Sequence, residues 1–281
     1  MGLIGIIGAG TMGSGIAQVA ALSDMDVLLY DASPSALESA LERIAQESRR
    51  RLEKGTLSGA EATRLASAIH PARSLQELRD AEVMIEAAAE VLAVKQQIFR
   101  DISAISRPNS LLATNTSSLS ITAIATAAAI PSSVVGMHFF NPPTVMNLVE
   151  VVRGTHTSEE ILRRTIDLAV RMRKTPVVCR DTPGFIVNRL ARPFYGEALR
   201  LLGENAADVE TIDRIVRREG GFKMGPFELM DLIGIDINYA VTRSVYEQFS
   251  RDPRFLPHPI QKQMVDAGLL GRKTKRGFYR Y

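Results

Sequence analysis

The sequence lacks the features that mark several common classes of protein. Its 281 residues contain only one cysteine, Cys179. An internal disulfide framework and a thiolate metal cage are therefore excluded. No apolar run reaches the roughly 18 residues of a membrane-spanning helix. The first apolar residues are not preceded by the basic segment that a secretory signal peptide has. The remaining candidate ligands, His70, His156 and His258, lack metal-ligand spacing. We therefore expect a cytoplasmic protein without a membrane segment or a metal site.

The sequence also lacks a strong excess of charge of one sign. Lys and Arg total 34 against 31 Asp and Glu, which gives a formal net charge of +3. Acidic residues interleave with the basic ones, so the pattern gives little support to nucleic-acid binding. A mildly basic surface does suit a small polyanionic substrate. With 46% hydrophobic and 23% charged residues, the composition is that of an ordinary globular chain.

What the sequence does contain is an alternation of short apolar runs and helical stretches. Strands are predicted at residues 3–7, 27–30, 83–85, 111–113, 134–137, 148–152 and 177–179. Helices are predicted at residues 14–22, 34–54, 58–68, 91–105, 119–129 and 158–173. This alternation predicts βαβ units and a parallel sheet. After Asp181-Thr182-Pro183-Gly184 the chain looks helical, so we expect an α/β domain over residues 1–182 and a helical domain over residues 183–281.

The first predicted strand is followed by a glycine motif, Gly8-Ala9-Gly10-Thr11-Met12-Gly13. The motif has the spacing G-x-G-x-x-G and opens a helix, and Asp31 ends the next strand, as in dinucleotide-binding units. The three glycines permit a tight turn, close approach of a pyrophosphate and close packing of helix on strand. Asp31 would accept hydrogen bonds from the adenosine ribose and repel a 2′-phosphate, which favours NAD over NADP. FAD and a plain βα turn remain alternatives.

Polar residues in four segments are candidates for catalysis. Ser117 and His138 follow or end apolar strands, where open α/β sheets bind ligands, and Asn188 lies on the first helix after the domain boundary. Transfer of hydride from an alcohol to NAD needs a base, and histidine suits this role near neutral pH. Glu150 lies inside an apolar run, where a carboxylate is costly to bury unless paired, and could orient His138. Ser117 and Asn188 could hold the reacting oxygen.

Each of these four residues also has an ordinary structural interpretation. His138 could be a core histidine bonded to backbone, and Glu150 an edge-strand charge that faces water. Ser117 could be a helix N-cap, and Asn188 could cap or bridge helices. The residues alone leave these alternatives open.

The same motifs occur together with Ile85-Glu86-Ala87 through Glu90, Pro183-Gly184-Phe185-Ile186-Val187-Asn188-Arg189, Gly225-Pro226-Phe227-Glu228 and Arg276-Gly277-Phe278-Tyr279. In this combination the chain resembles the L-3-hydroxyacyl-CoA dehydrogenase family, most closely its short bacterial 3-hydroxybutyryl-CoA dehydrogenases, over nearly its whole length. The resemblance implies a Rossmann-type N-terminal domain and an all-helical C-terminal domain that pairs two subunits. It also implies reversible, NAD-dependent oxidation of (S)-3-hydroxyacyl-CoA to 3-oxoacyl-CoA in fatty-acid or butanoate metabolism.

The resemblance further implies roles for individual residues. It makes His138 the catalytic base with Glu150 as its partner, and Ser117 and Asn188 the ligands of the substrate oxygen. Contacts to the cofactor are implied for Glu90, Lys95, Asn115, Asn141 and Lys273. Ser48 and Lys54 fall near a helical segment that contacts CoA. The sequence departs from the family at Lys275, where glycine is usual, and in the alanines at 87–89, where bulkier residues are common.

Two other functions remain open from the sequence. A related dehydrogenase that acts on a free sugar acid, such as gulonate, would keep the hydride chemistry without CoA. A catalytically idle NAD-binding protein would keep only the cofactor motif. Residues 225–236 carry apolar residues rimmed by charge, which could form a contact between two subunits or belong to the core of the domain.

Overall fold

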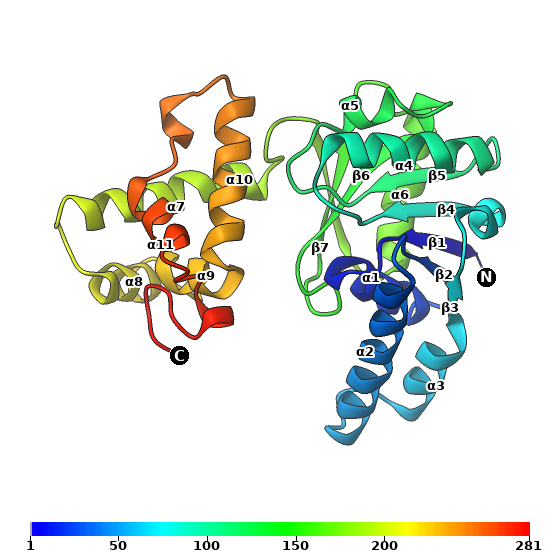
Figure 1. Cartoon of the computed structure of the whole chain (residues 1–281), viewed down its shortest axis with the longest axis horizontal. Helices are drawn as coiled ribbons and strands as arrows, with labels where there is room; N and C mark the ends of the chain where they lie inside the picture. The colour runs from blue at the N-terminus through cyan, green and yellow to red at the C-terminus, as the bar shows by residue number, and fades with distance from the viewer. Residues whose placement is uncertain (1) are drawn as a thin grey trace. The chain divides into compact units, whose positions relative to one another are not determined.

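The computed structural model describes residues 2–281, which form two compact units (Figure 1). The first unit ends at Thr182 and the second begins at Pro183. Each unit has a cluster of buried apolar side chains. No helix among the described residues is both long and apolar enough to cross a membrane.

The first unit is built on one eight-stranded sheet, ordered β3-β2-β1-β4-β5-β6-β7-β8. Its strands are β1 (Leu3–Ile7), β2 (Asp26–Tyr30), β3 (Ile69–Ala72), β4 (Val83–Glu86), β5 (Leu111–Thr114), β6 (Val134–Phe139), β7 (Leu148–Arg153) and β8 (Thr175–Arg180). All neighbouring strands are parallel except β6 and β7. The strand order reverses between β1 and β4, and ligands of open α/β sheets bind at such a reversal.

Six helices connect these strands: α1 (Thr11–Ala21), α2 (Pro34–Glu53), α3 (Gly59–Ala68), α4 (Leu92–Ile105), α5 (Ile121–Ala125) and α6 (Glu159–Arg171). The predicted starts of α2 and α3 follow from their caps. The Ser33 hydroxyl accepts from the Ala36 amide at the start of α2, and Ser58 and Glu61 form a capping box at the start of α3. Each cap satisfies amide groups that the first helical turn would otherwise leave without a partner.

The structure corrects two local predictions. The helix expected over 119–129 is present only as α5. After Ala125 the backbone makes hydrogen bonds to the third preceding residue, from the Ala127 amide to the Ile124 carbonyl and from the Ala128 amide to the Ala125 carbonyl, so the α-helix does not continue. No strand is predicted at β3, a four-residue edge strand whose central His70 and Pro71 are exposed. The mostly parallel α/β architecture itself is confirmed.

The second unit consists of helices α7 (Val187–Gly203), α8 (Val209–Arg218), α9 (Pro226–Ile233), α10 (Ile235–Gln248) and α11 (Pro259–Asp266) with short 3-10 turns. Two buried carboxylates hold the C-terminal segment, residues 278–281, against α8 and α9 through hydrogen bonds. Asp213 accepts from the Tyr279 hydroxyl, and Asp231 accepts from the amides of Phe278 and Tyr279. Lys275, just before this segment, has a left-handed φ of 57°, a conformation that glycine adopts without strain.

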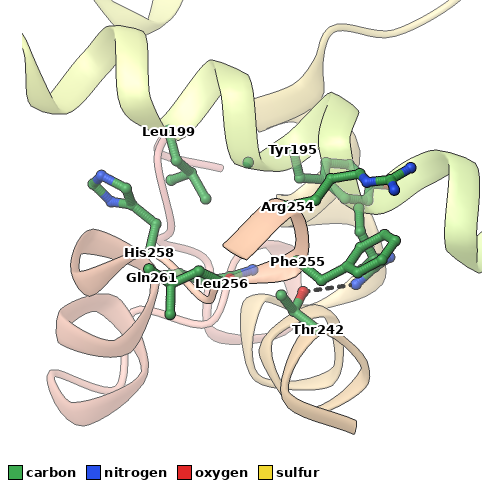
Figure 2. A pocket seen from close by; sticks show the side chains of 10 residues that line it. Tyr195, Leu199, Thr242, Arg254, Phe255, Leu256, His258 and Gln261 are labelled. Carbon is green, nitrogen blue, oxygen red and sulfur yellow. Dashed lines mark hydrogen bonds between the residues drawn. The ribbon is translucent and has the colours of Figure 1, made fainter. Parts of the chain in front are cut away.

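The second unit also contains a small cavity, shown in Figure 2 with Tyr195, Thr242 and Phe255 among its lining side chains. Its volume of about 10 Å³ is close to the space that one water molecule needs. Arg192 borders it and donates from Nη1 to the Asn238 carbonyl and the Thr242 hydroxyl. Burial lowers the pKa of this guanidinium to about 10, and its bonds join α7 to α10. The cavity is too small for an organic substrate.

Candidate active site

The glycine motif forms a tight turn between β1 and α1 that leaves one side open. Gly8 has a φ of 104°, and a Cβ there would lie 2.6 Å from the Ala87 carbonyl oxygen. A Cβ on Gly13 would overlap the Gly8 carbonyl oxygen, whereas a Cβ on Gly10 would meet no atom within 4 Å. The N-terminus of α1 has no side-chain cap. Open space at Gly10 beside uncapped amides fits a phosphate group.

Asp31, which directly follows β2, stabilises this turn. One of its carboxylate oxygens accepts from the Ala9 amide at 2.7 Å, and the other accepts from the Ser33 amide at 2.9 Å. Arg43 of α2 also donates to the Ala9 carbonyl at 3.2 Å. Each Asp31 oxygen retains a further lone pair, which a ribose hydroxyl could use. The structure thus fits the adenosine half of a dinucleotide.

A second group of polar residues lies where β4 and β5 end. The Lys95 side chain is 1% exposed, and its ammonium lies 2.7 Å from Glu86 and 3.4 Å from Glu90. Glu90 Oε1 accepts from the Thr116 hydroxyl at 2.7 Å and from the Ser117 amide at 2.8 Å. The Ser117 hydroxyl also lies 3.1 Å from this oxygen. The structure therefore brings together Glu90, Lys95 and Ser117, which the sequence placed in one site.

Glu90 carries a negative charge in this arrangement. Burial raises the pKa of its carboxyl, but attraction to Lys95 and hydrogen bonds from Thr116 and Ser117 more than offset this, so the pKa lies below its usual value. Ionised Glu90 therefore stabilises the fold at neutral pH, and this contribution is lost as the pH falls through the lowered pKa.

Glu86 is a member of this group to which the sequence assigned no role. Its position was a usable signal, because it ends the otherwise apolar β4, Val83-Met84-Ile85-Glu86. A carboxylate in such a place needs partners. The same argument had singled out Glu150.

His138 and Glu150 form a buried pair across the antiparallel strands β6 and β7. They are direct neighbours in the register, and His138 Nδ1 lies 2.7 Å from Glu150 Oε2. His138 is 6% exposed and Glu150 is 0% exposed, so the alternative of a Glu150 that faces water is wrong. Because the carboxylate holds the ring through Nδ1, proton exchange with a ligand would use Nε2.

Three further polar residues, Asn115, Asn141 and Cys179, belong to the strands and the loop around this pair. Asn115 Oδ1 accepts from the Phe139 amide at 2.8 Å, which ties the end of β5 to the end of β6 beside His138. Asn141 is exposed and precedes a cis peptide bond to Pro142. Burial and the negative charges of Glu150 and Asp181 raise the pKa of Cys179 to about 12, so this thiol stays protonated and weakly nucleophilic.

The other predicted site residues have different surroundings. Ser48 is among the buried residues of α2, whereas Lys54 is exposed at the end of that helix, so only Lys54 is accessible to a ligand. In the second unit, Asn188 lies in the first turn of α7 and its carbonyl accepts from Arg192 Nε. Lys273 donates to both carboxylate oxygens of Asp236 at 2.6 Å.

A glycine turn suited to a dinucleotide and a buried His–Glu pair in the same α/β unit are typical of the nicotinamide-dependent dehydrogenases with a Rossmann-type domain. Comparison with known proteins is more specific. Residues 3–182 match the NAD binding domain of 3-hydroxyacyl-CoA dehydrogenase, and residues 184–281 match its C-terminal domain. The chain belongs to the 3-hydroxyacyl-CoA dehydrogenase family, which confirms the predicted family, the predicted fold class and NAD as the cofactor.

Several relatives cover almost the whole chain. The 3-hydroxyadipyl-CoA dehydrogenase of Escherichia coli is 46% identical over 98% of this chain, which spans 58% of the length of that relative. The 3-hydroxybutyryl-CoA dehydrogenase of Bradyrhizobium diazoefficiens is 38% identical over 99% of this chain and 94% of its own length. A crystal structure of (S)-3-hydroxybutyryl-CoA dehydrogenase from Ralstonia eutropha superposes with a TM-score of 0.94 at 38% identity, covering 99% and 98% of the two chains.

Proposed function

We propose that this chain catalyses the reversible, NAD-dependent oxidation of the C3 hydroxyl of short (S)-3-hydroxyacyl-CoA esters, with 3-hydroxybutyryl-CoA as the preferred substrate. The observation that carries the proposal is the buried His138–Glu150 pair in a domain that belongs to this family. Bound NAD supplies the nicotinamide carbon that takes up the hydrogen and two electrons leaving C3.

The protein's part in the reaction is to move one proton and to hold the substrate oxygen. We assign His138 Nε2 as the atom that accepts the hydroxyl proton during oxidation and returns it during reduction. Glu150 fixes the ring and stabilises the imidazolium, because the protonated pair has no net charge. Ser117 and Asn188 are assigned to hold the substrate oxygen. Ionised Glu90 positions Ser117 through its bonds to the serine amide and hydroxyl.

The remaining assignments concern the cofactor and the CoA part of the substrate. Glu90, Lys95, Asn115, Asn141 and Lys273 are proposed to contact the cofactor, with Asp31 and the glycine motif at its adenosine and pyrophosphate half. The exposed cations Arg49, Arg50 and Lys54 at the end of α2 offer partners to the phosphates of CoA. We place this chemistry in the cytoplasm, in fatty-acid or butanoate metabolism.

The substrate assignment predicts a clear pattern of turnover. NADH oxidation, followed by absorbance, should be rapid with acetoacetyl-CoA and at least about tenfold slower with free acetoacetate or with NADPH. The relatives' names include a six-carbon diacid ester as well as butyryl-CoA, so 3-oxoadipyl-CoA belongs in the same assay. A higher kcat/KM for 3-oxoadipyl-CoA would overturn the four-carbon preference. Oxidation of a free sugar acid without CoA would overturn the substrate class.

The second unit is proposed to pair two copies of the chain. Three large apolar side chains within six residues of α9 and α10, Leu232, Ile233 and Ile237, are 47%, 39% and 50% exposed, and a second copy of the chain would cover them. Sedimentation equilibrium should therefore give about twice the chain mass of 30.8 kDa. Replacement of Ile237 by Glu should shift the equilibrium toward monomer. A wild-type protein that stays monomeric at micromolar concentration would contradict this assignment.

A further inference from the structure

Glu86 is a fully buried carboxylate at the carboxyl end of β4, next to the strand-order reversal of the sheet. It is 0% exposed and accepts three hydrogen bonds. The donors are the Ala88 amide at 2.6 Å, the Lys95 ammonium at 2.7 Å and the Thr114 hydroxyl at 2.6 Å. Both carboxylate oxygens of Glu86 therefore serve as hydrogen-bond acceptors.

The cluster of Glu86, Lys95 and Glu90, in which Glu86 and Lys95 are buried, carries an excess negative charge. Its one ammonium lies within 3.4 Å of both carboxylates, so two negative charges face one positive charge. Without Glu86, Lys95 and Glu90 would form a neutral pair. Since charges inside a protein are screened much less than charges in water, the remaining negative charge acts over several ångströms.

We propose that this cluster makes the cofactor site bind the oxidised nicotinamide, whose ring is positively charged, more tightly than the neutral reduced ring, and that Glu86 supplies the excess negative charge. The inference rests on the proposed function, which places the nicotinamide beside Glu90. In physical terms, a fixed negative charge attracts only the cationic redox state. Because this attraction stabilises bound NAD⁺ relative to bound NADH, it favours, at the bound cofactor, the direction that ends in NAD⁺, which is reduction of the 3-oxoacyl group.

Glu86 also has a mechanical role that the test must separate from its charge. Its partner Thr114 accepts in turn from the Thr116 amide at 3.3 Å, in the loop that carries Ser117. Replacing Thr114 by Val removes this link and one bond to Glu86 but leaves every charge in place. Thr114→Val is therefore the matched control for Glu86→Gln, which keeps the shape of the side chain and removes its charge.

The experiment measures the dissociation constants of NAD⁺ and NADH for the full chain by calorimetry and fluorescence. Glu86→Gln should raise the ratio of the NAD⁺ constant to the NADH constant by about tenfold, the size of one charge–charge interaction of this kind. Thr114→Val should change both constants in parallel and leave their ratio within about twofold. An unchanged ratio in a folded Glu86→Gln protein would overturn the proposal.

A second variant keeps the test decisive if Glu86→Gln does not fold. Glu90→Gln removes the other carboxylate of the cluster at a side chain that is 38% exposed, and it should shift the ratio in the same direction. If the wild-type enzyme turns over acetoacetyl-CoA but Glu90→Gln leaves the ratio of the two dissociation constants unchanged, the charge effect is refuted and the proposed function stands. A wild-type protein that binds neither form of the cofactor would refute the proposed function as well.

Discussion

Replacing His138 by Gln should lower kcat for acetoacetyl-CoA reduction by about 1,000-fold while the dissociation constant of NADH stays within about twofold. Glutamine has a similar volume and can still donate to Glu150, so the packing of β6 and β7 is kept. It cannot release or accept a proton near neutral pH, so the step assigned to His138 Nε2 is lost. Steady-state kinetics and NADH fluorescence titration measure the two quantities separately.

The matched comparison is Glu150→Gln, which keeps His138 but removes the charge that stabilises the imidazolium. Because the two side chains are bonded at 2.7 Å, the effects of the two substitutions should not add, and the double variant should be about as slow as His138→Gln alone. Wild-type turnover in His138→Gln would rule out His138 as the base. Additive losses would show that Glu150 acts independently of the histidine.

Much of the first unit could be predicted because its signals are local. Buried parallel strands are continuous apolar runs, and caps such as Ser33 and the Ser58–Glu61 box mark helix starts within a few residues. The antiparallel direction of β7 depends on how the chain returns to the sheet, which no local pattern encodes. That direction nevertheless places Glu150 directly opposite His138.

Candidate site residues could be picked out where a polar side chain ends or follows an apolar run, as at Asp31, Ser117 and His138. The role of Glu86 was not, because its partners Lys95 and Thr114 come from α4 and β5. The burial of Ser48 could also be predicted from the sequence. It repeats the spacing of the buried Leu37, Ala40 and Ile44 on α2, which places it on the core-facing side of the helix.

The second substitution with a large expected effect on stability and cofactor binding lies in the glycine motif. Gly13→Ala should lower the free energy of unfolding by about 3 kcal/mol and abolish measurable NADH binding. The added Cβ would overlap the Gly8 carbonyl oxygen, a backbone atom that cannot rotate away. Relief requires α1 to move away from β1, which displaces the helix N-terminus assigned to the pyrophosphate. Thermal unfolding followed by circular dichroism and NADH titration measure both consequences.

Gly10→Ala is the control that separates cofactor binding from folding. Gly10 has an ordinary φ of −67°, and a Cβ on it would contact no protein atom within 4 Å, so the variant should unfold at the wild-type temperature. The same Cβ would enter the space that a pyrophosphate needs for close approach, so NADH should bind at least about tenfold more weakly. Because only a ligand can collide with this methyl group, a stable Gly10→Ala protein with wild-type NADH affinity would show that the dinucleotide does not lie against the turn.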